Sequence, residues 1–161
     1  YLNVLFRYGY DRFCRRAADS GISGVIVPDL PYEEKHEPTD YSGKYGIDVI
    51  SLIAPTSHER IKMIAKEAEG FVYCVSSMGV TGVRSEITTD VGEMVRLVKS
   101  VKDIPCAIGF GISTPEQAKK MSESADGVIV GSAIEKIIAK YGKDSVKPVC
   151  DYVKSMKEAI S

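Results

Sequence analysis

The feature that most constrains the fold is a series of short apolar runs, rich in Val and Ile, that do not alternate with polar residues. They lie at residues 24–27, 49–53, 71–75, 106–108 and 127–130. Such runs are typical of strands buried on both faces of a parallel sheet. Helical patterns separate or follow them, at residues 10–20, 57–68, 91–102, 115–124, 133–141 and 145–160. The alternation predicts an α/β fold with a parallel sheet and crossover helices, built as a single domain over residues 1–161.

One crossover segment, residues 33–45, does not fit a regular helix. It contains Pro38, and an interior proline costs about 3 kcal/mol in a helix. We therefore expect a shortened or broken helix, with two pieces favoured over one. Sequence drift in an exposed crossover and a functional role remain equally good explanations.

Two glycine turns follow the last two apolar runs. Residues 109–116 read Gly-Phe-Gly-Ile-Ser-Thr-Pro-Glu, and residues 127–135 read Gly-Val-Ile-Val-Gly-Ser-Ala-Ile-Glu. Each predicts a strand, a glycine turn and a helix start; Ser113 or Thr114 would cap the first helix, ahead of Pro115. Free N–H groups at a helix N-terminus, approached through glycine, suit a dianion. In (β/α)8 barrels a phosphate site forms after strands seven and eight, so these turns predict a phosphate site.

The longest connection between two apolar runs contains residues 76–90. Loops of more than about 12 residues in compact domains are commonly lids, binding loops or disordered segments. Gly79 and Gly82 could act as hinges and Thr81 as a polar tip, which favours a lid that closes over a ligand. An ordinary mobile loop is the alternative.

Composition and charge exclude some classes of function. The net charge of −1 gives no reason to expect nucleic acid or an anionic membrane as a partner. No apolar run approaches the roughly 18–20 residues that span a bilayer. Nothing at the N-terminus resembles a signal peptide, so we expect a cytoplasmic protein.

Cysteine and histidine usage gives no sign of a disulfide framework or a metal centre. The four cysteines form no Cys-x-x-Cys pair, and we expect reduced, buried thiols: Cys14, Cys74, Cys106 and Cys150. His36 and His58, the only histidines, lie in polar stretches without paired ligands, so we expect solvated surface residues and no metal site.

Several motifs together resemble the alpha chain of tryptophan synthase, in the order of that family and over the whole chain. The motifs are Tyr1-Leu-Asn-Val-Leu-Phe6, Val25-Ile-Val-Pro-Asp-Leu-Pro-Tyr-Glu-Glu34, Gly70-Phe-Val-Tyr-Cys-Val-Ser76, Gly79-Val-Thr-Gly82, Gly109-Phe-Gly-Ile-Ser-Thr-Pro-Glu-Gln117 and Gly131-Ser-Ala-Ile-Glu-Lys-Ile-Ile138. The resemblance implies a (β/α)8 TIM barrel, present here as a partial barrel of about five βα units that forms its phosphate-binding half.

The resemblance also implies an activity, the aldol cleavage of indole-3-glycerol phosphate to indole and glyceraldehyde 3-phosphate in tryptophan biosynthesis. A pyridoxal-phosphate-dependent beta subunit would then use the indole, so no cofactor is expected in this chain. By position, the phosphate contacts fall on Gly82, Gly111, Gly131 and Ser132. The indole pocket and lid fall on Tyr73, Thr81 and Phe110, and the face that meets the beta subunit on Asn3, Phe6, Asp29 and Pro31.

The resemblance places the two catalytic carboxylates of the family upstream of Tyr1, so no catalytic residue is assigned in this chain. Asp29 is the only acid at the carboxyl end of a predicted strand, and we favour a turn or interface role for it over catalytic substitution. We expect the isolated chain to be inactive and marginally soluble, because an open sheet exposes two edges. A truncated chain and a naturally short one are both compatible with the sequence.

Two other functions stay open at this point. One is another phosphate-binding barrel enzyme, of the phosphoribosylanthranilate isomerase or indole-glycerol-phosphate synthase type, although the motifs at residues 79–82 and 28–31 argue against it. The other is a non-catalytic module that binds and activates a beta subunit.

Overall fold

The computed structural model describes residues 1–75, 91–109 and 111–161. Its strands form one parallel five-stranded sheet in the order β1-β2-β3-β4-β5. The strands are β1 (Gly24–Ile26), β2 (Asp48–Ile53), β3 (Val72–Val75), β4 (Cys106–Gly109) and β5 (Gly127–Val128). The predicted fold class is thereby confirmed.

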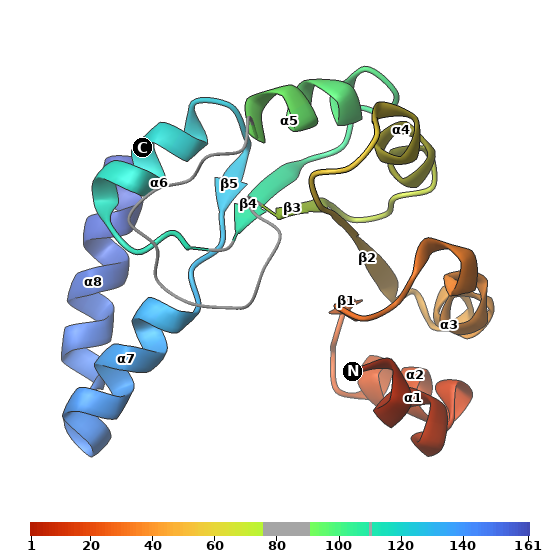
Figure 1. Cartoon of the computed structure of the whole chain (residues 1–161). Coiled ribbons are helices and arrows are strands. Elements are labelled where there is room, and N and C mark those ends of the chain that lie inside the picture. The colour runs from red at the N-terminus through yellow and green to blue at the C-terminus, as the bar shows by residue number, and fades with distance from the viewer. Residues whose placement is uncertain (76–90, 110) are drawn as a thin grey trace.

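Helices connect and flank the strands of this sheet. The α-helices are α1 (Leu2–Tyr8), α2 (Tyr10–Asp19), α3 (His36–Ser42), α4 (His58–Lys66), α5 (Val91–Lys99), α6 (Pro115–Ser122), α7 (Ser132–Tyr141) and α8 (Val146–Ala159). The 3-10 turns are η1 (Tyr32–Glu34), η2 (Gly43–Tyr45) and η3 (Gly142–Asp144). The sheet is curved, α3 to α6 follow its outer side, α1 and α2 lie at one end, and α7 and α8 lie at the other (Figure 1).

The register of the strands separates the two faces of the sheet. Leu52 pairs with Tyr73, which pairs with Ala107 in turn, so these side chains share one face, and all three are half-buried. One residue further along each strand, Ile53, Cys74 and Ile108 form the opposite row and are fully buried. The buried row belongs to the main core, together with residues of α4, α5 and α6. The half-buried row therefore lies on the open, inner face.

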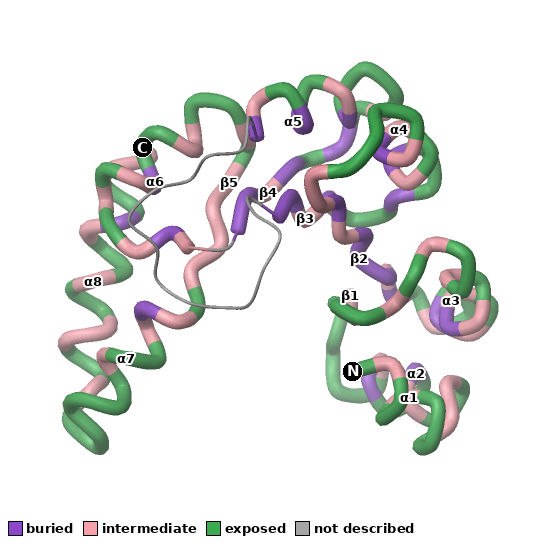
Figure 2. The backbone as a smooth tube through the Cα atoms, viewed as in Figure 1, coloured by how far each residue is buried: buried purple, intermediate pink, exposed green. Residues whose placement is uncertain are grey.

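The burial pattern fits an open arc rather than a closed shape. Buried segments concentrate in the central strands and the helix faces against them, whereas α1, α7 and α8 are largely exposed or half-buried (Figure 2). The accessible surface is 9667 Å² for a mass of 17.6 kDa. A compact monomer of this mass exposes about 7900 Å². The difference agrees with the open inner face and with the exposed strand edge at Ile26.

The helix boundaries agree with the sequence patterns to within a few residues. Ser57 caps α4 by accepting the Arg60 N–H, and Thr114 caps α6 in a capping box with Gln117. Pro115 occupies the first position of α6, where its missing N–H costs nothing. Both starts follow from local side-chain chemistry, which is why the sequence predicts them.

The irregular crossover forms a short helix between two 3-10 turns, η1, α3 and η2. The shortened helix is confirmed, but three short segments replace the two that we expected. Pro38 is buried in the first turn of α3. Amides there have no intrahelical acceptor, so the proline removes no hydrogen bond.

Three features of the structure depart from the sequence interpretation. Helix α1 had no predicted counterpart, and β5 contains two residues where four were expected. Backbone pairing continues one step beyond β5, since the Ile129 N–H donates to the Ile108 carbonyl at 2.7 Å. Cys14, Cys74 and Cys106 are buried as expected, but Cys150 is exposed on α8, so the expectation of four buried thiols is wrong.

Candidate functional site

The carboxyl ends of β3, β4 and β5 meet at one edge of the sheet, because neighbouring strands are parallel. Tyr73 on β3 projects along the inner face toward β4. A Cβ atom built on Gly109 would lie 2.5 Å from the Tyr73 Cζ and 2.6 Å from Cε1, and closer still to the hydroxyl. The absent side chain of Gly109 therefore makes room for this ring. Burial raises the pKa of the Tyr73 phenol, which stays protonated at neutral pH.

The turn after β4 needs glycine at one described position. Gly111 has a φ of 85°, in the region that side chains other than glycine rarely adopt. The helix that follows, α6, uses its own side chains to satisfy its first amides. The Gln117 Oε1 accepts from the Ser113 N–H at 2.8 Å and the Thr114 N–H at 3.2 Å, and Thr114 Oγ1 accepts the Gln117 N–H at 3.3 Å. The start of α6 therefore has little capacity left for a ligand.

The turn after β5 is different. Gly131 is the N-cap of α7, and no side-chain cap is formed there. Its carbonyl accepts the first intrahelical bonds, from Ile134 at 2.8 Å and Glu135 at 3.1 Å. The amides of Ser132 and Ala133 come before these bonds. A Cβ built on Gly131 would meet no atom of the described residues within 4 Å, so these residues leave room beside the N-cap.

This arrangement suits a small anion at α7. The partial positive charge at the start of this ten-residue helix attracts negatively charged oxygen. The amides of Ser132 and Ala133 and the Ser132 hydroxyl can donate hydrogen bonds to it. From the sequence, both glycine turns were predicted to contribute to the phosphate site. The capping box at α6 distinguishes them, and the Gln117 signal for it was present three residues after Thr114.

The structure places four of the predicted substrate residues at this edge of the sheet: Tyr73, Gly111, Gly131 and Ser132. Three others lie outside the described residues, namely Thr81, Gly82 and Phe110, as does the predicted lid over residues 76–90.

The predicted partner face lies at the other end of the sheet. Asn3, Phe6, Asp29 and Pro31 are all exposed. They belong to α1 and to the turn after β1, and one hydrogen bond joins the two segments: Asp29 Oδ1 accepts the Leu2 N–H at 2.8 Å. This bond gives Asp29 a structural role at the start of α1.

Contacts on the far side of this turn anchor it to α4. Arg60 of α4 forms a bidentate pair with Glu33 at 2.8 and 3.1 Å, and the Tyr32 hydroxyl donates to Glu67 at 2.8 Å. The Arg60 guanidinium lowers the pKa of the Glu33 carboxyl. These exposed contacts contribute little energy singly, but together they fix the direction in which the turn leaves β1.

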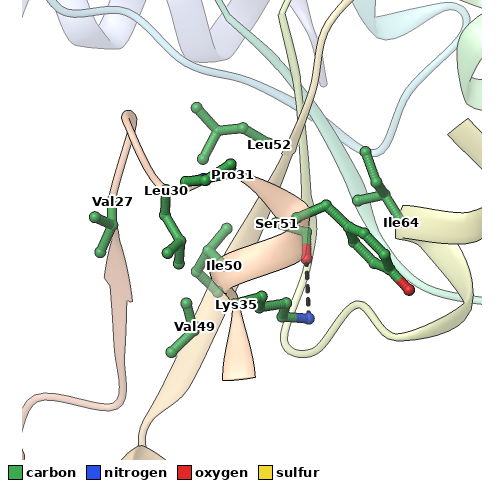
Figure 3. A pocket seen from close by; sticks show the side chains of 10 residues that line it. Val27, Leu30, Pro31, Lys35, Val49, Ile50, Ser51, Leu52 and Ile64 are labelled. Carbon is green, nitrogen blue, oxygen red and sulfur yellow. Dashed lines mark hydrogen bonds between the residues drawn. The ribbon is translucent and has the colours of Figure 1, made fainter. Parts of the chain in front are cut away.

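A small cavity of about 40 Å³ lies beneath the turn, lined mainly by apolar side chains from the turn after β1, from β2 and from α4 (Figure 3). The half-buried Lys35 extends along it. Its Nζ donates to Ser51 Oγ at 3.3 Å and to the Glu67 carbonyl at 2.6 Å. Burial lowers the pKa of this ammonium group. A cavity of this size holds one or two waters rather than a substrate, so we assign Lys35 a structural role.

Residues 1–75, 91–109 and 111–161 contain no candidate metal centre and no candidate membrane span. No group of three or more His, Cys, Asp or Glu side chains there could hold a metal ion. His36 and His58 are exposed, as expected. No helix in the same ranges is long and apolar enough to cross a bilayer.

The curved parallel sheet with helices on its outer side defines an α/β protein built of successive βα units. Comparison with known proteins makes this specific. The family model "Tryptophan synthase alpha chain" matches residues 1–161. The tryptophan synthase alpha chain of Lacticaseibacillus casei is 48% identical over 160 residues, and that of Thermoanaerobacter sp. is 49% identical over 162. Each alignment covers 99% of this chain, but 60% and 62% of the respective relative.

Solved structures agree with the sequence comparison. A chain from a study of the tryptophan synthase a2b2 complex of Pyrococcus furiosus superposes with a TM-score of 0.85 at 36% identity, covering 98% of this chain and 64% of that one. The alpha subunit from Campylobacter jejuni gives 0.82 at 33% identity, covering 97% and 62%. The chain belongs to the tryptophan synthase alpha chain family, and it spans about 60% of the length of its curated relatives. The other phosphate-binding barrel enzymes considered from the sequence are therefore not favoured.

Proposed function

We propose that this chain supplies the phosphate-binding part of an alpha-type tryptophan synthase lyase, which cleaves indole-3-glycerol phosphate to indole and glyceraldehyde 3-phosphate. Family membership supports the reaction. The observation that carries the proposal for this chain is the uncapped N-terminus of α7 at Gly131, which lies at the same edge of the sheet as Tyr73.

In this proposal the phosphate binds to the amides at the start of α7, with the Ser132 hydroxyl, the turn at Gly111 and the residue Gly82 as further contacts. The indole lies on the inner face against Tyr73, with Phe110 and the lid residue Thr81 completing its surroundings. Binding energy from the phosphate then holds the reacting end of the substrate in a fixed orientation.

The carbon–carbon cleavage itself needs acid and base groups, since indole C3 gains a proton while a substrate hydroxyl loses one. We propose that the carboxylates for these steps come from the part of the family fold that lies upstream of the position matched by Tyr1. Asp29 is a poor substitute, because its carboxylate is exposed and accepts the Leu2 N–H. The chain alone is then expected to bind a phosphate ester without cleaving it.

The proposed partner is a tryptophan synthase beta subunit, which would hold the pyridoxal phosphate. On this chain, the face proposed to bind the beta subunit is formed by Asn3, Phe6, Asp29 and Pro31. An exposed aromatic side chain beside polar groups is common in such interfaces, and Phe6 is 67% exposed. The similar Pyrococcus furiosus chain comes from an a2b2 complex whose subunits activate each other, which supports a partner of this kind.

Calorimetric titration with indole-3-propanol phosphate tests the phosphate site. Gly131→Asp adds a carboxylate at the uncapped helix start and should weaken binding at least tenfold. Thr114→Asp is the matched control, because it adds the same charge at α6 but keeps a capping oxygen there. Equal affinity of wild type and Gly131→Asp, or no binding by the wild type, would refute the site.

An indole-release assay tests the division of labour. The purified chain should produce no indole from indole-3-glycerol phosphate above the buffer rate, even where it binds the analogue. Indole formation by the isolated chain would show that acid–base groups within it suffice.

A further inference from the structure

A groove of about 680 Å³ is lined by residues of α1, α2 and α3, next to the proposed partner face. Phe6 of that face also lines the groove. The rest of the lining contains two more aromatic rings, three acidic side chains and two basic ones: Tyr10, Tyr41, Asp11, Glu37, Asp40, Arg12 and His36. We call it the aromatic groove.

Three rings form a continuous series along this groove. Phe6 and Tyr10 meet edge to face, with centroids 6.3 Å apart and an interplanar angle of 70°. Tyr10 and Tyr41 follow at 5.9 Å and 34°. The series starts at the exposed Phe6 and ends at the half-buried Tyr41. A ligand entering from the partner face would therefore meet aromatic surface throughout.

Three carboxylates lie beside the rings. Glu37 accepts the Tyr10 hydroxyl at 3.1 Å, and Asp11 accepts the Tyr45 hydroxyl at 2.8 Å. Within the part of the chain that the structure describes, neither these two nor Asp40 forms an ion pair. Phenol donors orient a carboxylate without neutralising it, so the groove presents three carboxylates against one arginine and one histidine among its lining residues.

Arg12, which lines the groove, and the neighbouring Lys44 stack on rings rather than pairing with these acids. Arg12 lies over Tyr8 at 4.7 Å from the centroid, and Lys44 over Tyr41 at 5.0 Å. Tyr41 thus already binds an ammonium group through its π face. The same chemistry is available to a cation brought by another molecule.

We propose that the aromatic groove receives an arginine side chain of the beta-type partner subunit. The inference rests on the proposed function, which supplies the partner, and it extends the binding face from α1 into the groove. A guanidinium stacks on an aromatic ring while its N–H fork reaches two carboxylates, here Glu37 and Asp40. Charge complementarity of this kind raises the association rate and fixes the register of an interface.

Calorimetry with the purified beta subunit of Lacticaseibacillus casei tests the proposal at 50 and 300 mM KCl. The variant Glu37→Gln/Asp40→Asn should bind about tenfold more weakly at low salt, and its affinity should depend less on salt. Glu123→Gln/Asp144→Asn is the matched control, because it removes the same charge from exposed positions far from the groove. Its affinity should remain within twofold of wild type.

The outcomes separate the two proposals. Absence of binding by the wild-type chain overturns the partner assignment. Binding by the wild type with equal affinity and salt dependence in the groove variant overturns the arginine inference alone. Thermal melts establish that each variant is folded. The single variant Asp40→Asn removes no described hydrogen bond, so it leaves the Tyr10–Glu37 contact in place.

Discussion

Replacing Gly109 by alanine tests the packing at the centre of the candidate site. The added methyl would lie 2.5 and 2.6 Å from two ring carbons of Tyr73, well inside the van der Waals distance. The backbone of Gly109 does not have a positive φ, so strain comes from space alone. Tyr73 must rotate away or the β3–β4 pairing must open.

Forced overpacking of this kind costs about 1–3 kcal/mol. Each kcal/mol lowers the melting temperature by about 2–4 °C in a chain of roughly this size. We therefore expect Gly109→Ala to melt about 2–12 °C below wild type. Gly127→Ala is the control, since a Cβ there meets nothing within 4 Å and its φ is not positive either. That variant should change stability by less than about 0.5 kcal/mol.

A double-mutant cycle separates this clash from a general effect of alanine in the strand. Tyr73→Ala removes the ring, so Gly109→Ala should cost little in that background. Urea unfolding should give a coupling free energy of about 1 kcal/mol or more between the two sites. Additive effects, within about 0.5 kcal/mol, would refute the view that the Tyr73 ring occupies the space in front of Gly109.

Three other variants test single contacts of the fold. Asp126 accepts from Lys99 Nζ at 3.0 Å and from the Cys106 N–H at 2.8 Å, and the lysine lowers the pKa of its carboxyl. The contribution of the Asp126 carboxylate to folding stability is present above its unfolded pKa near 3.9 and is lost as the pH falls through its lower folded pKa. In urea unfolding from about pH 5 to 2, wild type should therefore lose more stability than Asp126→Asn. Thr114→Ala removes the cap of α6 and should cost about 1 kcal/mol by the same measurement, whereas an unchanged midpoint would contradict the cap. Lys35→Met leaves the Ser51 hydroxyl and the Glu67 carbonyl without this donor and should cost about 1–3 kcal/mol, which unchanged urea unfolding would disprove.

The fold was largely predictable because its signals are local. Buried parallel strands are apolar throughout, and caps such as Ser57 and Thr114 identify helix starts within four residues of sequence. Helix α1 carries no such signal: it has no buried residue, and its first turn is held by Asp29, which is 27 positions away. A contact of that range cannot be read from a single sequence.

The candidate site was predictable in part for the same reason. Glycine turns after strands indicate where a ligand could approach, but they do not say which helix start is already occupied by its own side chains. At α6 the spacing of Thr114 and Gln117 indicates a capping box, but only the structure shows that the Gln117 amide oxygen accepts both the Ser113 and Thr114 N–H groups. The exposure of Cys150 was not predictable, because its helix, α8, packs mainly on α6 and α7, with little contact to the sheet.

Among the residues that the structure describes, the three inner strands are paired on both sides, whereas β1 and β5 are short and have a neighbour on one side alone. Amide hydrogens should consequently exchange with solvent in a spatial gradient, slowest in β3 and fastest at the outer strands. Proteases and chaperones that recognise frayed backbone would then encounter this chain first at its two flanks, long before the central strands separate.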